Sequence, residues 1–225
     1  MHPVTLVLAQ ADGLPSLWEL TKSGGPIMWP IGACSVVALA YAVERGIGLA
    51  SGRLGSERFG KKVLETLRSG GVAPALELCK EKRTPLARIL ETALRHSAAT
   101  HAEREKRVED AASDEVRRMS ANLKPLLVVY IVAPLLGLLG TVWGLILAFA
   151  TIATKEGLGK PELLAHGVYQ ALVTTAAGLG VAIPTVVLYY YLKGRVERFS
   201  RRTESLYDEV DRSLVAPPEI AHAHP

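Results

Sequence analysis

The sequence predicts an all-α membrane protein with three transmembrane helices, two of which extend into long cytoplasmic helices. The first observation is composition: the 225 residues are 49% hydrophobic and have a mean hydropathy of +0.22. That is too apolar for a disordered chain and high for a soluble one. The second is a set of long uncharged runs, and the third is helical spacing of apolar residues in the charged segments beside them.

The uncharged runs predict where the chain crosses the membrane. Three runs contain no charged side chain: 23–43, 125–154 and 167–192. About 20 apolar residues cross a bilayer core, and backbone groups in lipid must hydrogen-bond within the chain, so each run should be helical. Two such runs in one small chain would be very unusual in a water-soluble core. We therefore expect membrane helices at 26–45, 125–154 and 168–192.

The basic residues predict the orientation. Segment 51–124 contains 16 Lys and Arg, and the tail 193–225 contains six. Segment 1–25 contains one and the loop 155–167 contains two. Because Lys and Arg concentrate on the cytoplasmic side, we expect 51–124 and 193–225 in the cytoplasm. The N-terminal segment and the short loop should then lie outside, on the opposite side of the membrane, which is the periplasm if the chain is in a bacterial inner membrane.

The charged segments also have helical patterns. We expect two short helices at 57–69 and 74–82, separated at Gly70–Gly71. A pattern without Gly or Pro then runs from 86 to 124, and it predicts one continuous helix over 86–153 that includes the second span. The tail has one apolar stripe, formed by Val196, Phe199, Thr203, Leu206, Tyr207, Val210 and Leu214.

Motifs for common chemistry are absent from the sequence. It contains no P-loop, no GxSxG and no zinc-type Cys/His spacing, and two cysteines cannot form a disulfide scaffold. The pair His222 and His224 fits a solvated tail better than a metal site. Acidic residues interleave with the basic ones, which disfavours nucleic-acid binding. We expect no enzyme activity, no cofactor and no metal.

The two longer spans have no Asp, Glu, His, Lys or Arg. A protein that moves protons alone normally has an ionisable side chain at membrane depth. The interior polar side chains are Thr141, Thr151, Gln170, Thr174, Thr175 and Thr185. These groups can hydrogen-bond water or a partner's carboxylate, but they do not titrate near neutral pH. Each threonine could instead bond to a carbonyl of its own helix.

Small residues cluster in the same two spans. Gly137, Gly140 and Gly144 lie in the second span, and Gly178 and Gly180 lie in the third beside several alanines. Small residues let membrane helices approach closely. The pattern fits packing within one subunit and packing between subunits equally well.

Three segments resemble the MotA/TolQ/ExbB proton channel family, and the similarity is greatest to ExbB and TolQ. GGPIMWPIGACSVVALAYAVER (24–45) resembles the family's first span, and LGLLGTVWGLILAF (136–149) resembles the core of its second. QALVTTAAGLGVAIPTVVLYY (170–190) resembles the core of its third span. The resemblance extends over about residues 20–212.

The resemblance implies a subunit of an energy-transducing complex in the bacterial inner membrane. In that family, five such subunits surround two single-span partners of the ExbD/TolR class, whose membrane Asp relays protons, and the motion is transmitted to TonB or TolA. Thr141 and Thr175 match the family's pore-facing threonines, and Gln170 stands where classical members have Glu. Gln170, Thr174 and Gly178 share one helix face.

Two other functions stay open from the sequence. The chain could be a non-conducting membrane scaffold that assembles partners through its helices, and Gln170 gives this some weight. An independent transporter is disfavoured because the chain has no internal repeat and no charged site at the membrane midplane.

Overall fold

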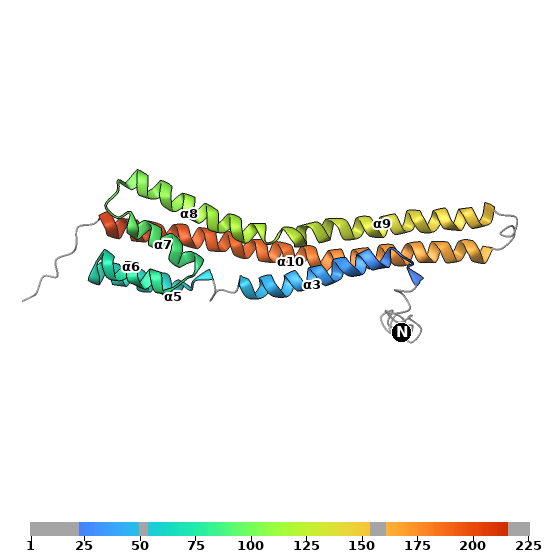
Figure 1. Ribbon diagram of the computed structural model, residues 1–225, viewed down its shortest axis with the longest axis horizontal. Helices are drawn as coiled ribbons and strands as arrows, with labels where there is room; N and C mark the ends of the chain where they lie inside the picture. The colour runs from blue at the N-terminus through green and yellow to red at the C-terminus, as the bar shows by residue number, and fades with distance from the viewer. Residues whose placement is uncertain (1–22, 50–53, 154–160, 216–225) are drawn as a thin grey trace, which may run out of the picture. The chain divides into compact units, whose positions relative to one another are not determined.

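The computed structural model describes residues 23–49, 54–153 and 161–215, and within these ranges the chain is helical and has no strand. The helices are α3 (Met28–Gly48), α5 (Glu57–Gly70), α6 (Val72–Glu81), α7 (Pro85–Arg95), α8 (His101–Ala121), α9 (Lys124–Ala153) and α10 (Pro161–Val215) (Figure 1). Most of the predicted periplasmic N-terminal segment, residues 155–160 of the predicted loop, and the tail with His222 and His224 lie outside the described residues. Residues 161–167, which were predicted to belong to the loop, form the first turns of α10.

Three stretches of helix are long and apolar enough to cross a membrane: α3, the run from α8 through α9, and α10. This confirms the predicted fold class. The 55 residues of α10 are more than twice the number that a bilayer core requires. The helix therefore continues well beyond its uncharged part, as the sequence predicted.

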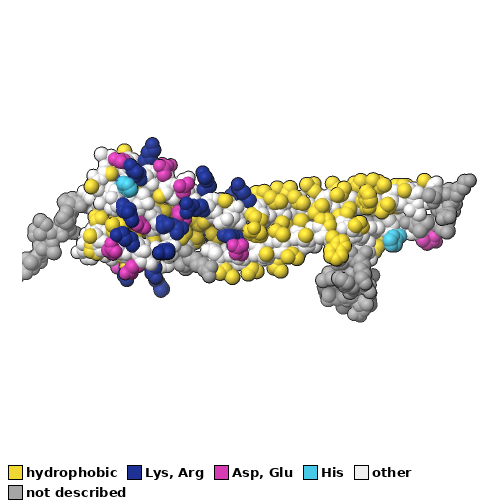
Figure 2. All heavy atoms as spheres, viewed as in Figure 1, with side chains coloured by type: hydrophobic (Ala, Val, Ile, Leu, Met, Phe, Trp, Pro, Cys, Tyr) yellow, Lys and Arg dark blue, Asp and Glu magenta, His cyan; other side chains and the backbone are white. Residues whose placement is uncertain are grey.

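The chain forms two compact units. The first, from residues up to 40 and 125–187, contains most of α3, nearly all of α9 and the N-terminal part of α10. In this unit α9 and α10 run side by side (Figure 1). The opposite face of α9 exposes large apolar side chains, among them Leu135, Leu138, Val142, Ile146 and Phe149. Apolar side chains also cover this unit in Figure 2, as expected for a surface that meets lipid or other apolar helices.

The second unit, residues 41–124 and 188 onward, packs α5 to α8 with the C-terminal part of α10. The predicted short helices at 57–69 and 74–82 are α5 and α6, and Gly71 separates them with a φ of 81° that suits glycine. Ser56 and Thr84 cap α5 and α7. The core takes apolar residues from α7 and from the predicted stripe of the tail. From α7 these are Leu86, Ile89, Leu90, Ala93 and Leu94, and from the stripe Val196, Phe199, Tyr207 and Val210.

The prediction of one helix over 86–153 is wrong at residues 96–100. There α7 ends, and α8 begins after Thr100, whose hydroxyl accepts a hydrogen bond from the Glu103 N–H at 3.4 Å. The buried Arg104 guanidinium donates to the carbonyls of Ser97 (3.3 Å) and Ala99 (3.0 Å). These bonds satisfy backbone groups that the end of α7 leaves without helical partners.

Arg104 also joins this connection to α10. Its Nε and one terminal nitrogen each lie 2.7 Å from Asp211 Oδ1, and the Arg104 side chain is 3% exposed. His101 Nδ1 lies 2.9 Å from the other oxygen of the same carboxylate. A buried guanidinium needs such a complete set of partners, because burial of an unpaired charge is costly.

A second, smaller interruption separates α8 from α9. The helix ends at Ala121, Asn122 and Leu123 form a turn, and α9 begins at Lys124. Pro125 has no N–H to donate to the preceding turn, and proline is tolerated in the first turn of a helix. The predicted continuous helix is therefore three helices, although α8 and α9 follow each other with only this turn between them.

Candidate functional site in the α9–α10 helix pair

Glycines allow the backbones of α9 and α10 to touch. A Cβ added to Gly137 would lie 3.0 Å from Thr174 O and Thr175 Cα. A Cβ on Gly178 would lie 2.5 Å from Ala133 O, closer than real Cβ atoms come. Gly140 and Gly144 face Thr174 and Ala171 in the same way. These four glycines therefore pack within one subunit, which is the arrangement that small residues favour in membranes.

Gly180 differs from these four glycines. It is exposed, and a Cβ added there would meet no atom within 4 Å. Of the five glycines that the sequence singled out, this one faces away from the helix pair. Its face is open to lipid or to another chain.

Thr174 lies inside the helix contact. It is 1% exposed, and its hydroxyl donates to Ala171 O at 2.8 Å, with Gly137 O on the neighbouring helix at 3.4 Å. A Cβ on Gly140 would lie 2.3 Å from its Oγ1. In the single chain this side chain packs α10 against α9 and has no free surface.

Thr175 and Thr141 are only half-buried. The Thr175 hydroxyl donates to Gly137 O on α9 at 3.1 Å, and the Thr141 hydroxyl donates to Leu138 O in its own turn at 2.6 Å. Each proton is thus engaged by a carbonyl, while the hydroxyl oxygen keeps lone pairs that can accept a hydrogen bond. In these rotamers both groups can accept a bond from a protonated carboxyl. Rotation of the hydroxyl would let them donate to a carboxylate.

Gln170 lies one turn before Thr174 and meets the segment that precedes α3. A Cβ added to Gly25 would lie 2.1 Å from Gln170 Nε2. Gly25 has a φ of +67°, a conformation that favours glycine. The amide of Gln170 therefore packs on a tight turn at the start of the first apolar helix, a contact that sequence spacing alone did not indicate.

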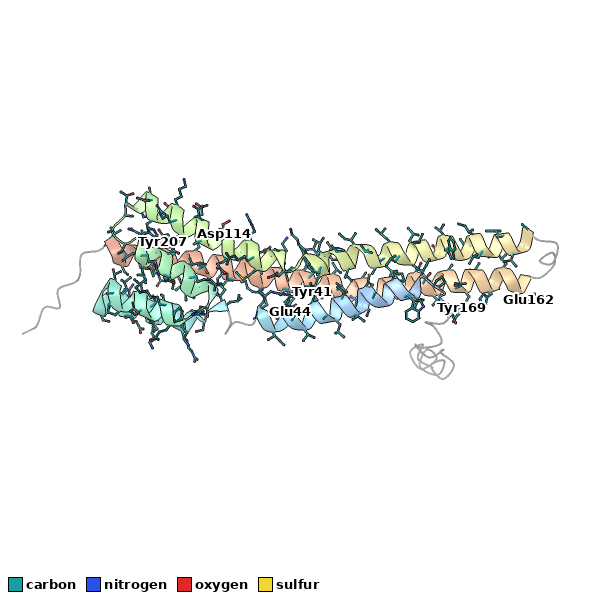
Figure 3. All side chains as sticks on the ribbon, in the orientation of Figure 1. Tyr41, Glu44, Asp114, Glu162, Tyr169 and Tyr207 are labelled. Carbon is teal, nitrogen blue, oxygen red and sulfur yellow. The ribbon has the colours of Figure 1, made fainter. Side chains whose placement is uncertain are left out.

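The electrostatics of the helix pair are set by the lack of ionisable groups. In α9, Lys124 alone carries a formal charge, at the first residue, and α10 has none from Gly167 to Leu192. Glu162 and His166 precede that stretch, and Glu162 lies near the beginning of α10 in Figure 3. The site can solvate a proton carrier through its hydroxyls, but it has no carboxylate or imidazole to carry the proton itself.

Comparison with known proteins identifies the family. The profile of the MotA/TolQ/ExbB proton channel family matches residues 81–205. An ExbB homolog of Methanothermobacter thermautotrophicus is 31% identical over 195 residues, which cover 86% of this chain and 65% of that protein. Biopolymer transport protein exbB1 of Vibrio cholerae is 31% identical over 77% of both chains. The Tol-Pal system protein TolQ of Pseudomonas aeruginosa is 38% identical over 46% of this chain and 45% of its own length. The chain belongs to the MotA/TolQ/ExbB proton channel family.

Proposed function

We propose that this chain is the channel-forming subunit of an inner-membrane complex that uses the proton motive force to drive transport or envelope work. It would assemble as a homopentamer around a single-span partner of the ExbD/TolR kind and act on a TonB- or TolA-like protein. The observation that supports this most is the apolar α9–α10 pair, which offers hydroxyls and no titrating group. The names of the ExbB and TolQ relatives agree with transport and Tol-Pal roles.

In the proposed mechanism the partner supplies the Asp and this chain supplies its surroundings. A carboxylate that enters an apolar interior has a raised pKa, because burial disfavours the charged form. The oxygens of Thr141 and Thr175 accept a bond from the protonated acid, and their protons turn toward the carboxylate after it releases its proton. The chain thereby lowers the cost of the charged state within the membrane. Gln170 and Thr174 belong to the same face, with Thr174 holding the helix pair together.

The test is the pair of variants Thr141→Val and Thr175→Val, which are near-isosteric and remove only the hydroxyl. We expect both to slow proton-motive-force-dependent uptake or envelope function at least tenfold while the oligomer persists. Thr151→Val is the matched control, because the Thr151 hydroxyl also donates to a carbonyl of its own helix, Leu147 O at 2.8 Å, about 15 Å further along α9 than Thr141. Full activity in both test variants would reject the proposed lining.

The scaffold alternative makes a different prediction. A non-conducting scaffold would still purify with its partners, but its function would not respond to Thr141→Val, Thr175→Val or an uncoupler. Co-purification with a single-span protein that has an Asp near the start of its span, followed by native mass, tests the partner and the stoichiometry together. A stable monomer under membrane-like protein densities would contradict the homopentamer.

A further inference from the structure

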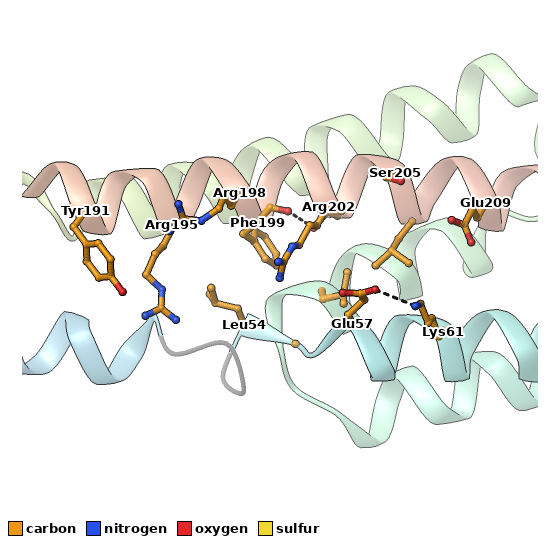
Figure 4. Close-up of a pocket in the computed structure, with 14 residues that line it drawn as sticks. Leu54, Glu57, Lys61, Tyr191, Arg195, Arg198, Phe199, Arg202, Ser205 and Glu209 are labelled. Atoms are coloured by element: carbon orange, nitrogen blue, oxygen red, sulfur yellow. Dashed lines mark hydrogen bonds and ion pairs between the residues drawn. The ribbon is translucent and has the colours of Figure 1, made fainter.

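A basic cleft lies in the second unit, along the side of α10 that faces the start of α5 (Figure 4). Its volume is about 490 Å³. From α10 it is lined by Tyr191, Arg195, Arg198, Arg202 and Glu209, and from α5 by Glu57 and Lys61. The three arginines follow the i, i+3, i+7 spacing that places side chains on one helix face.

The cleft has an excess of positive charge. Its lining contains four basic side chains and two carboxylates, a formal difference of +2. Glu57 is already paired with Lys61 at 3.0 Å, and this contact lowers the pKa of its carboxyl. Within the described residues, no ion pair joins Arg198 or Arg202 to a carboxylate. The charge of Arg202 also lowers the pKa of Glu57, after the larger effect of Lys61 and without a direct ion pair. The N–H donors of Arg198 and Arg202 can therefore bind an anion from outside the chain.

The row of arginines on α10 begins at the depth of lipid headgroups and continues beyond it. The uncharged run ends at Leu192, so Arg195, Arg198 and Arg202 lie about 5, 9 and 15 Å further along the helix at 1.5 Å per residue. The headgroup layer of one leaflet is about 5–8 Å thick, so Arg195 leaves the helix within it and Arg198 just past it. Helix side chains lean toward the N-terminus, and the Arg202 side chain leans back toward Tyr191 in Figure 4. Tyr191, which is exposed, stands at the apolar edge of this layer, where tyrosine is common in membrane proteins.

The lining also includes large apolar side chains. These are Leu54, Leu86, Phe199 and Leu206, and they lie beside the hydroxyl groups of Thr203 and Ser205. Guanidinium groups bind phosphate oxygens through paired N–H donors, and the apolar side chains suit the glycerol and first methylenes of a lipid. A soluble phosphate compound would use only the basic half of this lining.

We propose that this cleft binds the phosphate group of an anionic phospholipid, held by Arg198 and Arg202 with Arg195 beside them. The bound lipid would tie α10 to the start of α5 at the membrane surface. The proposal goes beyond the proton-channel role and does not depend on it, because lipid binding is measured without any transport activity.

The experiment uses the full chain purified in mild detergent and two double variants with the same change in charge. Arg198→Gln/Arg202→Gln removes the cleft donors, and Arg201→Gln/Arg212→Gln removes two exposed arginines of the same helix that do not line the cleft. Native mass spectrometry reports retained phospholipid, and titration with short-chain phosphatidylglycerol reports affinity. We expect about 30-fold weaker binding in the cleft variant, at about fivefold for each arginine near an anionic surface. The control variant should keep the wild-type affinity.

Further measurements distinguish a lipid phosphate from a soluble phosphate compound and check that the variants are folded. Short-chain phosphatidylcholine reports the need for net negative charge, and glycerol 3-phosphate and inorganic phosphate report binding without acyl chains. Binding of glycerol 3-phosphate as tight as that of phosphatidylglycerol would overturn the lipid assignment. An equal loss of affinity in both double variants would overturn the cleft as the site, since it would indicate only surface charge. Circular dichroism and oligomer mass confirm that both variants remain folded.

Discussion

The substitution Gly178→Ala tests whether α9 and α10 pack as the structure places them. The new methyl carbon would lie 2.5 Å from Ala133 O, whereas ordinary contact begins at 3.4 Å, so the helices must part by about 0.9 Å. The obstacle is a backbone carbonyl, so rotation of a side chain cannot relieve it. The same separation would stretch the bond from the Thr175 hydroxyl to Gly137 O from 3.1 Å to about 4 Å, which is too long for a hydrogen bond.

The steric overlap and the lost hydrogen bond together give the expected loss in free energy of unfolding. Overpacking costs about 1–3 kcal/mol, and an interhelical hydrogen bond in a membrane protein contributes about 0.6–1.7 kcal/mol. Alanine regains about 1 kcal/mol because it forms helix better than glycine. We therefore expect Gly178→Ala to lower the free energy of unfolding by about 1–4 kcal/mol. A chain of this size loses about 2–4 °C of Tm for each kcal/mol, so its Tm should fall by about 2–15 °C.

Gly180→Ala is the matched control, because it makes the same substitution two residues away in open space. Alanine forms helix better than glycine by about 1 kcal/mol, so this variant should be as stable as the wild type or slightly more stable. Thermal unfolding of both variants in the same detergent, followed by circular dichroism, compares them. Equal stability of Gly178→Ala and Gly180→Ala would refute the close approach of the two helices. Native mass of Gly180→Ala reports separately whether this open face meets another subunit.

Three further predictions concern other parts of the chain. Asp211→Asn leaves the buried Arg104 without its carboxylate and should lower the free energy of unfolding by about 3 kcal/mol in chemical denaturation, with recovery when Arg104→Met is added. Burial, assisted by a nearby carboxylate, raises the pKa of the Cys79 thiol to about 12, so iodoacetamide at pH 8 should modify it only after unfolding. Because an unfolded thiol ionises near pH 9, this group should reduce stability as the pH rises from 9 to 12, and Cys79→Ala should remove that part of the pH dependence. A cysteine at Glu162 should react with an impermeant maleimide added outside the membrane, and one at Ser113 only after lysis; the reverse pattern would contradict the predicted orientation.

The sequence predicted the elements whose signal is local. The apolar positions of α7 recur at helical spacing, and Leu86, Ile89 and Leu90 are all buried. The end of α7 was not predicted, although Thr100 and Glu103 have the spacing of a capping box. The absence of Gly and Pro after residue 85 outweighed that motif in the prediction, whereas the structure ends the helix with polar contacts from Arg104.

The packing partner of the small residues in α9 and α10 could be identified only from tertiary contacts. Small residues at Gly137 and Gly178 predict close approach to some helix, but the same pattern fits a helix of the same chain or of a neighbour. The structure distinguishes the two arrangements. A Cβ added to Gly178 would meet Ala133 O of the same chain, whereas a Cβ added to Gly180 would meet no atom within 4 Å. The basic cleft was missed for a related reason. Its arginines alternate with acidic residues along the sequence, whereas on the face of α10 that lines the cleft three arginines stand against Glu209 alone.

The buried stripe of α10 changes in side-chain size along the helix, and its two surroundings explain the change. In the first unit the buried positions are small, with Ala171, Thr174 and Gly178 against a single helix. In the second unit they are large beyond the uncharged run, as at Phe199 and Tyr207. Lipid provides no hydrophobic drive to bring helices together, so close backbone contact and hydrogen bonds must hold the pair. In water, burial of large apolar side chains provides that drive. The helical spacing of buried positions therefore continues along α10, while the size of the side chains at those positions depends on whether lipid or water surrounds the helix.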